Sequence, residues 1–559
     1  MSNPSSSDDP VPTSPPVSVS STSDEPQVRD QPTDVAAWWQ GALAGLVAGA
    51  VAIGVGELVT GLLAPTPGLV AAVANRVIDL APASVNEVGK DLFGLKQKTA
   101  LTTGTTILAL VFASVLGVAS LKRPWIGASG ITAFGIVGMF AIADDAQGSP
   151  VAGAVIAGLA TIAGVAALYT LVGVANDQAR GPSSQTLASD QTTIAAAAHR
   201  RTFMGWVLLG GGLAMLGNFA GQALRNRSSA EGAREDVALV GTDDSSDVAT
   251  QIADAQNTEV AATAGITPIV VPNDNFYRID TAIIVPQINP DDWELSIKGM
   301  VDNPRTYSFM DLVERATTVA PVTLSCVSNE VGGNLVGNAV WQGVPLTELL
   351  DEAGVQSGAT QIKSQSVDGW NCGFPTDLAY DGRTALVAVA MNGEALPIEH
   401  GFPVRLVVSG LYGYVSATKW LSEIELTRLE DFDGYWIPRG WSKDGPVKTQ
   451  SRIDTPHSGS GTTPGQQLAV AGVAWAPNIG IERVEVQIDD EPWVDAELGE
   501  SLGINAWSQW RALWTATEGE HQIRVRATDR SGYTQEEARS PVAPDGATGW
   551  HTVRINIRA

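Results

Sequence analysis

The chain has 559 residues, more than a single hydrophobic core organises, so we expect several domains. Its formal net charge of −26 excludes general binding to nucleic acid, because a polyanion attracts basic proteins. Only two cysteines occur, Cys326 and Cys372, which excludes a disulfide-rich scaffold and a four-cysteine iron–sulfur cluster. None of the five histidines lies in a membrane-length apolar run, so we expect no haem in this chain either.

Residues 1–35 are rich in Ser, Pro and Asp, a composition typical of a disordered tail, and they contain no cleavable signal peptide. Residues 36–225 follow with apolar runs that reach the roughly 20 residues needed to cross a bilayer as a helix. The five predicted transmembrane helices are 37–63, 100–121, 124–143, 150–175 and 202–224.

Basic residues in short loops predict the orientation of these spans, because Lys and Arg stay on the cytoplasmic side. Lys122 and Arg123 follow the second span, and Arg200 and Arg201 precede the fifth. Both loops and the N-terminus are therefore expected in the cytoplasm, and everything after residue 225 outside it. The long loop after the first span carries bases too, Lys98 among them, but its length weakens the rule there.

The pair Arg200 and Arg201 stands just before Phe203 and a moderately apolar run, in "AHRRTFMGWVLLGGGLAML". This arrangement resembles a twin-arginine export signal in the middle of the chain. Ordinary anchoring by cytoplasmic arginines would explain the same pair equally well.

Three further regions follow the membrane part. Residues 226–270 are small, acidic and unpatterned, which favours an extracytoplasmic linker. Residues 271–445 mix strand-like runs with helical ones, so we expect an α+β domain. The expected strands are Ala282–Val285 and Val404–Val408, and the expected helices are Phe309–Arg315 and Leu346–Ala353. Residues 446–559 alternate apolar and polar side chains, as in "IERVEVQID", which predicts an all-β sandwich.

Cys326, in "PVTLSCVSNEVGG", ends an apolar strand-like run just before a Gly-containing turn. A thiolate there is a soft donor suited to a redox-active metal, and the glycines let a bulky ligand approach the backbone. The residue types alone also allow a nucleophile, a plain buried cysteine or a disulfide with Cys372.

Four stretches together resemble the sulfite oxidase family of molybdopterin enzymes: "TLSCVSNEVGG", "MNGEALPIEHGFPVRLVV", "GYVSATKWLSEIEL" and "GYWIPRGWSKDGPVKTQSRI". The likeness covers about residues 271–559 and keeps the family's order of motifs. It implies a molybdopterin-binding catalytic domain over 271–445 and an immunoglobulin-like domain of the dimerisation type over 446–559. The implied cofactor is molybdenum-molybdopterin.

The resemblance also implies roles for individual residues. Cys326 would be the protein ligand to molybdenum and, with Tyr277 and Arg278, a catalytic residue. His400 and Arg405 match residues that anchor a phosphate and the polar pterin edges. The full set of implied cofactor-binding residues is Asn275, Tyr277, Arg278, Cys326, Asp368, His400, Arg405, Ala417, Thr418 and Lys419.

Such a centre transfers an oxygen atom between water and substrate in a two-electron reaction. In sulfite oxidases basic side chains follow the cysteine closely, whereas this chain has Glu330 and Val331 there. An acidic side chain repels a dianion, so reduction of sulfoxides or N-oxides is an alternative to sulfite-type oxidation. An alternative from another class is a membrane-anchored binding protein whose enzyme-like domain holds no metal.

The partners follow from the same interpretation. We expect a small oxygen-atom donor or acceptor, an external electron-transfer partner such as a cytochrome or quinone-linked protein, the membrane, and a second copy of the chain in a homodimer. Molybdopterin is inserted into a folded domain in the cytoplasm, and the twin-arginine route carries folded proteins. We therefore expect a multi-pass protein in the plasma membrane of a prokaryote, with its catalytic domain outside.

Overall fold

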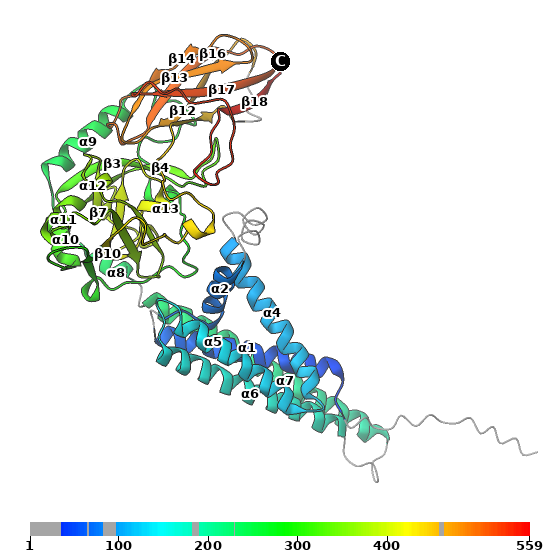
Figure 1. The fold of residues 1–559 in the computed structure, drawn as a ribbon. Helices are drawn as coiled ribbons and strands as arrows, with labels where there is room; N and C mark the ends of the chain where they lie inside the picture. The colour runs from blue at the N-terminus through cyan, green and yellow to red at the C-terminus, as the bar shows by residue number, and fades with distance from the viewer. Residues whose placement is uncertain are drawn as a thin grey trace, which may run out of the picture.

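The chain forms a bundle of helices followed by two extramembrane domains (Figure 1). The computed structural model describes residues 35–63, 66–81, 97–180, 189–227, 230–457 and 463–558. The predicted disordered tail, apart from residue 35, lies outside these ranges. The helical region comes first, a mixed α/β domain follows, and an all-β domain ends the chain, so the predicted order of fold classes is confirmed.

Five helices in the described part of the chain are long and apolar enough to cross a membrane. A further helix, α2 (Leu69–Leu80), was not predicted and packs against α5. Pro124 begins α5 because its missing N–H is not needed at the first helical position. The membrane-length helices are α1 (Trp38–Leu62), α4 (Gln97–Ser120), α5 (Pro124–Ala143), α6 (Pro150–Arg180) and α7 (Ser189–Arg227).

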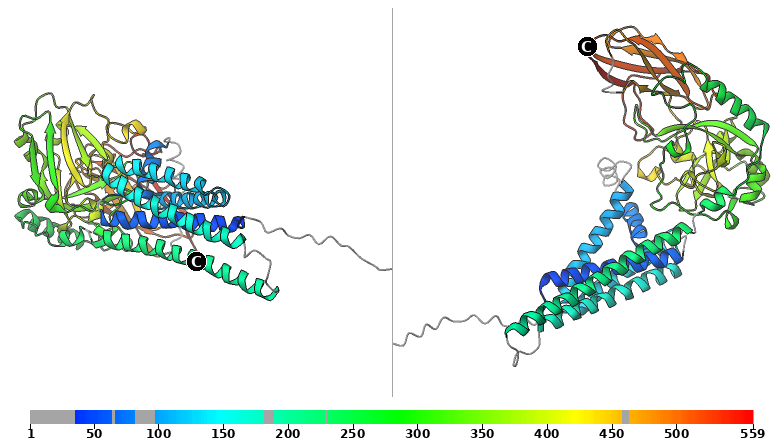
Figure 2. Two further views of the ribbon diagram at one scale, coloured as in Figure 1. Left: turned by 90° about the horizontal axis from the view of Figure 1, so that it is seen from below. Right: turned by 180° about the vertical axis from the view of Figure 1, so that it is seen from behind.

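Helices α1 and α7 pack unusually closely because glycines line their contact. A Cβ atom on Gly217 would lie 2.6 Å from the carbonyl oxygen of Gly54, and one on Gly61 would lie 2.5 Å from that of Gly221. Small residues allow this approach of two membrane helices. Near the same ends of the two helices, Arg225 forms an ion pair with Glu57 at 2.6 Å. Figure 2 shows α7 running along the bundle.

The mixed α/β domain contains two five-stranded sheets. One sheet has the order β2-β1-β10-β5-β6, and the other has β3-β4-β7-β8 with β9 paired to β7. The strands of the first sheet are β1 (Glu294–Gly299), β2 (Arg305–Ser308), β5 (Gln361–Ser366), β6 (Asn371–Pro375) and β10 (Leu421–Thr427). Those of the second are β3 (Thr318–Ser325), β4 (Val336–Pro345), β7 (Ala385–Met391), β8 (Glu394–Ala395) and β9 (Arg405–Val408).

Short helices connect these strands. Ser308 and Asp311 form a capping box at the start of α10, and Gly354, with φ of 71°, ends α11 in the left-handed conformation. The short helices of this domain are α10 (Phe309–Arg315), α11 (Leu346–Ala353), α12 (Asp377–Tyr380), α13 (Gly413–Ser416), η2 (Asn273–Asn275), η3 (Pro290–Asp292), η4 (Ile398–His400) and η5 (Ile437–Arg439).

Two segments differ from the sequence-based expectation. The segment 226–270 folds onto the α/β domain rather than lying loose: it contains α8 (Glu231–Glu235) and α9 (Asp243–Gln256), and Ala255 is buried in the core. Residues 282–285 form no strand. The Ala282 carbonyl accepts a hydrogen bond from Lys98 instead of from a neighbouring strand, and Pro286 has no N–H to donate.

The C-terminal domain consists of two four-stranded antiparallel sheets, of order β11-β12-β16-β15 and β14-β13-β17-β18. It lies on the far side of the α/β domain from the helical bundle (Figure 1). Its strands are β11 (Gln450–Thr455), β12 (Gln467–Trp475), β13 (Ile481–Ile488), β14 (Val494–Asp495), β15 (Glu497–Leu498), β16 (Ser508–Thr515), β17 (Gly519–Asp529) and β18 (His551–Ile557).

Buried contacts join this domain to the α/β domain. The indole N–H of Trp507 donates to the Ile269 carbonyl at 2.8 Å, and the Trp507 amide donates to the Thr323 hydroxyl at 2.8 Å. Trp507 belongs to the same hydrophobic core as β3 and β4. The two domains therefore pack together as one unit and are not held only by a flexible linker.

The close α1–α7 contact predicts the effect of one added side chain. Gly217→Leu should lower the thermal unfolding midpoint of the detergent-purified protein, because the new side chain forces the helices apart at a cost of about 1–3 kcal/mol. Gly212→Leu on the same helix is the control, since a Cβ there meets nothing within 4 Å. Equal midpoints for the two variants would contradict the packing described.

Candidate active site

Cys326 stands at the end of β3, where the strand enters a tight turn. Its amide donates to the Leu335 carbonyl at 2.9 Å, and its carbonyl accepts from the Asn329 amide at 3.0 Å. The sulfur lies 2.9 Å from the Ser328 hydroxyl oxygen. Neither Cys326 nor Cys372 forms a disulfide, and Cys326 is half-buried. The turn therefore presents an accessible thiol in a fixed position.

The C-terminal domain presses on the loop that follows this cysteine. Gly332 has φ of +80°, and a Cβ atom there would lie 2.2 Å from the His551 ring. The Arg452 guanidinium donates to the Gly333 carbonyl at 2.9 Å. Only glycine fits the conformation and the space at position 332. Glu330, in the same loop, is exposed.

His400 and Arg405 are buried side by side at the start of β9. The Arg405 guanidinium donates to the His400 carbonyl at 3.1 Å and lies 4.9 Å from the centre of the Trp341 ring. His400 Nε2 lies 3.1 Å from the Asn273 carbonyl. Because a carbonyl only accepts, Nε2 carries the proton and Nδ1 is left as an acceptor. That Nδ1 is buried and has no hydrogen-bond partner in the part of the chain that the structure describes.

Burial sets the charge of this pair. Desolvation, together with the charges of Lys419 and Arg405, lowers the pKa of His400 to about 3, so the imidazole is neutral at pH 7. Desolvation lowers the pKa of Arg405 to about 10, which leaves it charged. Among the described residues no carboxylate pairs with Arg405. The site thus keeps a buried positive charge, which favours an anionic ligand.

A second buried cation, Lys419, lies close to His400. Its ammonium donates to Asp280 Oδ2 at 3.1 Å and to the Glu399 carbonyl at 3.0 Å. Arg278 also binds Asp280 Oδ2, at 3.1 Å, and pairs with Glu399 at 2.8 Å. Burial lowers the pKa of Lys419 to about 8, although Asp280 opposes the shift. Asp280 is buried too, but its cationic neighbours hold its pKa well below the usual range.

Tyr277 connects these cations to the cysteine. Burial and the nearby Cys326 raise the pKa of the Tyr277 phenol far above its usual value, while Arg405 acts in the opposite direction. The ring stacks on Phe276, with centroids 5.1 Å apart, and Phe276 in turn packs edge-on against His400. Tyr277, Cys326, His400 and Arg405 are therefore gathered in one place.

The remaining predicted residues lie around this group with different exposures. Thr418 is fully buried, and its hydroxyl contacts Ser364 at 2.7 Å and the Cys372 sulfur at 3.2 Å. Burial raises the pKa of the Asp368 carboxyl, which accepts from the Trp370 amide at 3.1 Å. Asn275 ends η2 with an exposed side chain, and Ala417 directly follows α13.

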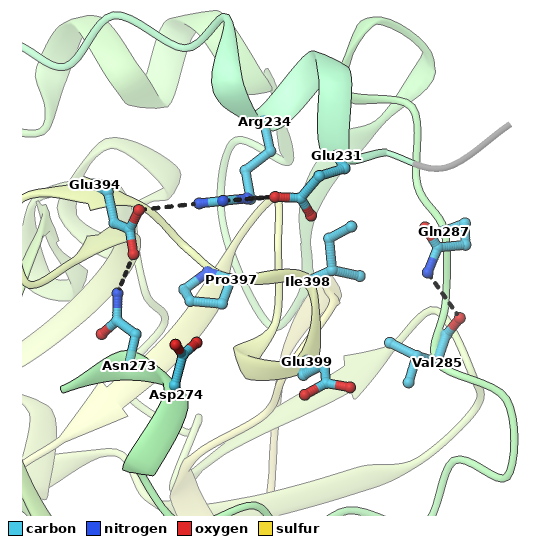
Figure 3. A pocket seen from close by; sticks show the side chains of 10 residues that line it. All are labelled: Glu231, Arg234, Asn273, Asp274, Val285, Gln287, Glu394, Pro397, Ile398 and Glu399. Atoms are coloured by element: carbon cyan, nitrogen blue, oxygen red, sulfur yellow. Dashed lines mark hydrogen bonds and ion pairs between the residues drawn. The ribbon is translucent and has the colours of Figure 1, made fainter. Parts of the chain in front are cut away.

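An acid-lined pocket of about 390 Å³ borders η2 and η4 (Figure 3). Arg234 lies between Glu231, at 2.6 Å, and Glu394, at 3.5 Å. Asp274 and Glu399 add two further carboxylates to the lining. This charge disfavours an anionic ligand, so the cationic residues around His400 and Arg405 are the better anion site.

Sequence reasoning missed three residues of this region. Asp280 joins two predicted cofactor residues, and Lys98 reaches it from the membrane helix α4. Tyr412 is buried with its pKa raised to about 12, chiefly by desolvation, and its hydroxyl accepts a 3.4 Å bond from the Lys448 amide. Tyr412 stands directly before the "GYVSATKWLSEIEL" stretch, so its place next to a motif of the site was the available signal.

Residues 282–436 match the protein family described as "Oxidoreductase molybdopterin binding domain". By class the chain is thus a molybdopterin-binding oxidoreductase. It is 36% identical over 153 residues to "Uncharacterized oxidoreductase YuiH" of Bacillus subtilis (strain 168). This match covers 27% of this chain and 74% of that protein.

Other relatives match a larger share of the chain. The chain is 26% identical over 340 residues to mitochondrial sulfite oxidase of Rattus norvegicus, covering 52% of this chain and 62% of the rat protein. It is 25% identical over 363 residues to sulfite oxidase of Arabidopsis thaliana, covering 54% of this chain and 92% of the plant protein. The chain belongs to the sulfite oxidase family of molybdopterin-dependent oxidoreductases.

The neutral state of His400 predicts a pH dependence of stability. Its pKa is about 3 in the folded chain against 6.5 when exposed, so the unfolded state binds the extra proton and stability falls as the pH drops below 6.5. Protonation of His400 alone should lower the free energy of unfolding by about 2 kcal/mol between pH 6.5 and 5. His400→Gln should therefore flatten the fall of the thermal unfolding midpoint over this range.

The control for that measurement is His457→Gln, which changes an exposed histidine outside the site. Its pH profile should follow the wild type. A His400→Gln profile as steep as the wild-type profile would contradict burial of a neutral imidazole.

Proposed function

We propose that the chain is a membrane-anchored molybdenum-molybdopterin oxidoreductase with Cys326 as the protein ligand to the metal. The observation that carries the proposal is the grouping of this half-buried thiol with Tyr277, neutral His400 and Arg405, a cation with which no described carboxylate pairs. A thiolate suits a soft, redox-active metal.

The residues present fit this cofactor by their donor and acceptor chemistry. Arg405 and Lys419 are buried cations that would bind a phosphate through charge-assisted hydrogen bonds. The unpartnered Nδ1 of His400 is an acceptor that would take an N–H of the pterin edge. The chain thus offers both kinds of group in one buried place.

When bound, the cofactor supplies two-electron oxygen-atom transfer. The chain's residues bind it and orient it: Arg405 and Lys419 hold its negative charge, while the Cys326 turn fixes the sulfur. The Tyr277 phenol stays protonated at neutral pH, so it can donate a hydrogen bond near Cys326. His551 and Arg452 keep the loop after Cys326 in place.

One observation favours a substrate other than the sulfite dianion. Arg278, the clearest anion-binding residue near the site, is already paired with Asp280 and Glu399. Glu330 and Val331 add no positive charge to the Cys326 loop. The first proposal is therefore oxygen-atom transfer like that of sulfite oxidases, but with an altered substrate pocket. The second proposal is reduction of neutral sulfoxides or N-oxides on the same cofactor.

We place the catalytic domain outside the plasma membrane of a prokaryote, with the N-terminus in the cytoplasm. Three parts of the membrane region meet the α/β domain, which supports their lying on one side of the membrane. Lys98 pairs with Asp280, Ala146 meets Gly369, and α7 leads into the α/β domain. These are the ends that the charges in short loops predict to be outside. An external cytochrome or quinone-linked protein would exchange electrons, and the immunoglobulin-like C-terminal domain would form a homodimer.

Metal analysis of the full-length protein tests the cofactor proposal. Made in a molybdopterin-competent host, the wild type should hold molybdenum, and Cys326→Ser should lose the redox response of the metal to sulfite, sulfoxides and N-oxides. Cys372→Ser is the control, because this thiol is fully buried against Ser364 and Thr418.

Absence of molybdenum from the wild type, or an unchanged centre in Cys326→Ser, would overturn the assignment. The first of these results would favour the alternative class, a membrane-anchored binding protein without a metal. The substrate that changes the redox state of the wild-type metal decides between the two enzymatic directions.

The export route is tested by the pair Arg200→Lys and Arg201→Lys. Both positive charges remain, so ordinary anchoring predicts no change. A twin-arginine route predicts that the catalytic domain stays in the cytoplasm, where protease added to intact spheroplasts does not cut it. Digestion equal to that of the wild type would reduce the pair to a topology signal.

A further inference from the structure

Lys98, in the first turn of the membrane helix α4, reaches into the α/β domain. Its ammonium forms an ion pair with Asp280 Oδ1 and donates to the Ala282 carbonyl at 2.7 Å. The Asp280 side chain is 6% exposed, and the Lys98 side chain is 34% exposed. A buried carboxylate of the catalytic domain is thus paired with a membrane helix.

The two oxygens of Asp280 have different partners. Arg278 and Lys419 both donate to Oδ2, and Lys98 alone among the described residues donates to Oδ1. With both oxygens held, the carboxylate has a fixed orientation, and the two cations at Oδ2 are fixed with it. Without Lys98, a buried oxygen loses its donor and the carboxylate is no longer held in one orientation beside Lys419 and Arg278.

A second contact joins the membrane region to the same face. Gly369, beside Asp368, has φ of +85°, and a Cβ atom there would lie 2.8 Å from the Cβ of Ala146. Ala146 belongs to the loop between α5 and α6. The first turn of α4 and the loop between α5 and α6 therefore both meet the α/β domain next to residues of the candidate site.

We propose that the membrane region completes the cofactor site, with Lys98 as a positioning residue. By holding Asp280 Oδ1, Lys98 keeps Lys419 directed at the bound cofactor and slows the loss of that cofactor. This inference rests on the proposed function. Because the cofactor is inserted in the cytoplasm, before Lys98 and Asp280 meet outside, Lys98 affects retention of the cofactor and not its insertion.

The test measures loss of molybdenum from the purified full-length protein. Wild type, Lys98→Gln and Lys98→Arg are dialysed in detergent, and the metal remaining on the protein is followed by elemental analysis. Lys98→Gln should lose molybdenum on the order of 10-fold faster, the lower end of the loss of metal affinity that follows mutation of supporting residues. Lys98→Arg, which keeps the charge, should restore most of the retention.

The matched control is Lys122→Gln, an exposed lysine just beyond the opposite end of α4. It should retain molybdenum like the wild type. The starting molybdenum content should be equal in all variants. A thermal unfolding measurement on cofactor-free protein, made in a molybdopterin-deficient host, separates positioning from folding, because positioning predicts a folded Lys98→Gln protein.

Each outcome is decisive. If the wild type holds molybdenum and Lys98→Gln loses it no faster than Lys122→Gln, the inference is wrong while the proposed function stands. Failure of Lys98→Arg to restore retention, or unfolding of cofactor-free Lys98→Gln, also overturns it. A wild type without molybdenum refutes the proposed function itself.

Discussion

Burial of positive charge is the constraint on which the rest of this structure depends. Arg405 and Lys419 are almost fully removed from water, and only Lys419 has a carboxylate partner among the described residues. Buried cations are costly unless they are paired and hydrogen-bonded, so the surrounding chain supplies carbonyls, the Trp341 ring and Asp280. A folded domain retains such charges when an anionic ligand shares them.

Two other parts of the chain act on this charged centre from opposite sides. The C-terminal domain fixes the loop after Cys326 through His551 and Arg452, while the membrane region holds Asp280 through Lys98. Neither contact touches the sulfur. His551 and Arg452 fix the backbone of the loop that follows Cys326, and Lys98 fixes the carboxylate that binds Lys419. A precise site needs such a rigid supporting shell. The domains therefore form one functional unit.

The sequence predicted the parts that local pattern controls. The helix Phe309–Arg315 begins at a capping box, and the helix Leu346–Ala353 ends at a glycine. Long apolar runs predicted the membrane helices. Motif order pointed to Cys326, His400 and Arg405 together. The pairing of Asp280 with Lys98 was beyond reach, because it joins residues 182 positions apart and Lys98 belongs to no motif. The helices within 226–270 were missed because their stability comes from packing on the next domain.

The ion pair of Glu57 with Arg225 has a consequence for assembly. The proposed export route requires α7 to enter the membrane after the first four spans. Until then Glu57 lacks Arg225, its partner in the ion pair, and the glycines of α1 that pack against α7 are not covered by it. An unpaired carboxylate at a membrane helix surface is unfavourable. Arrival of α7 with its folded domain would then neutralise this carboxylate and cover the glycines of α1.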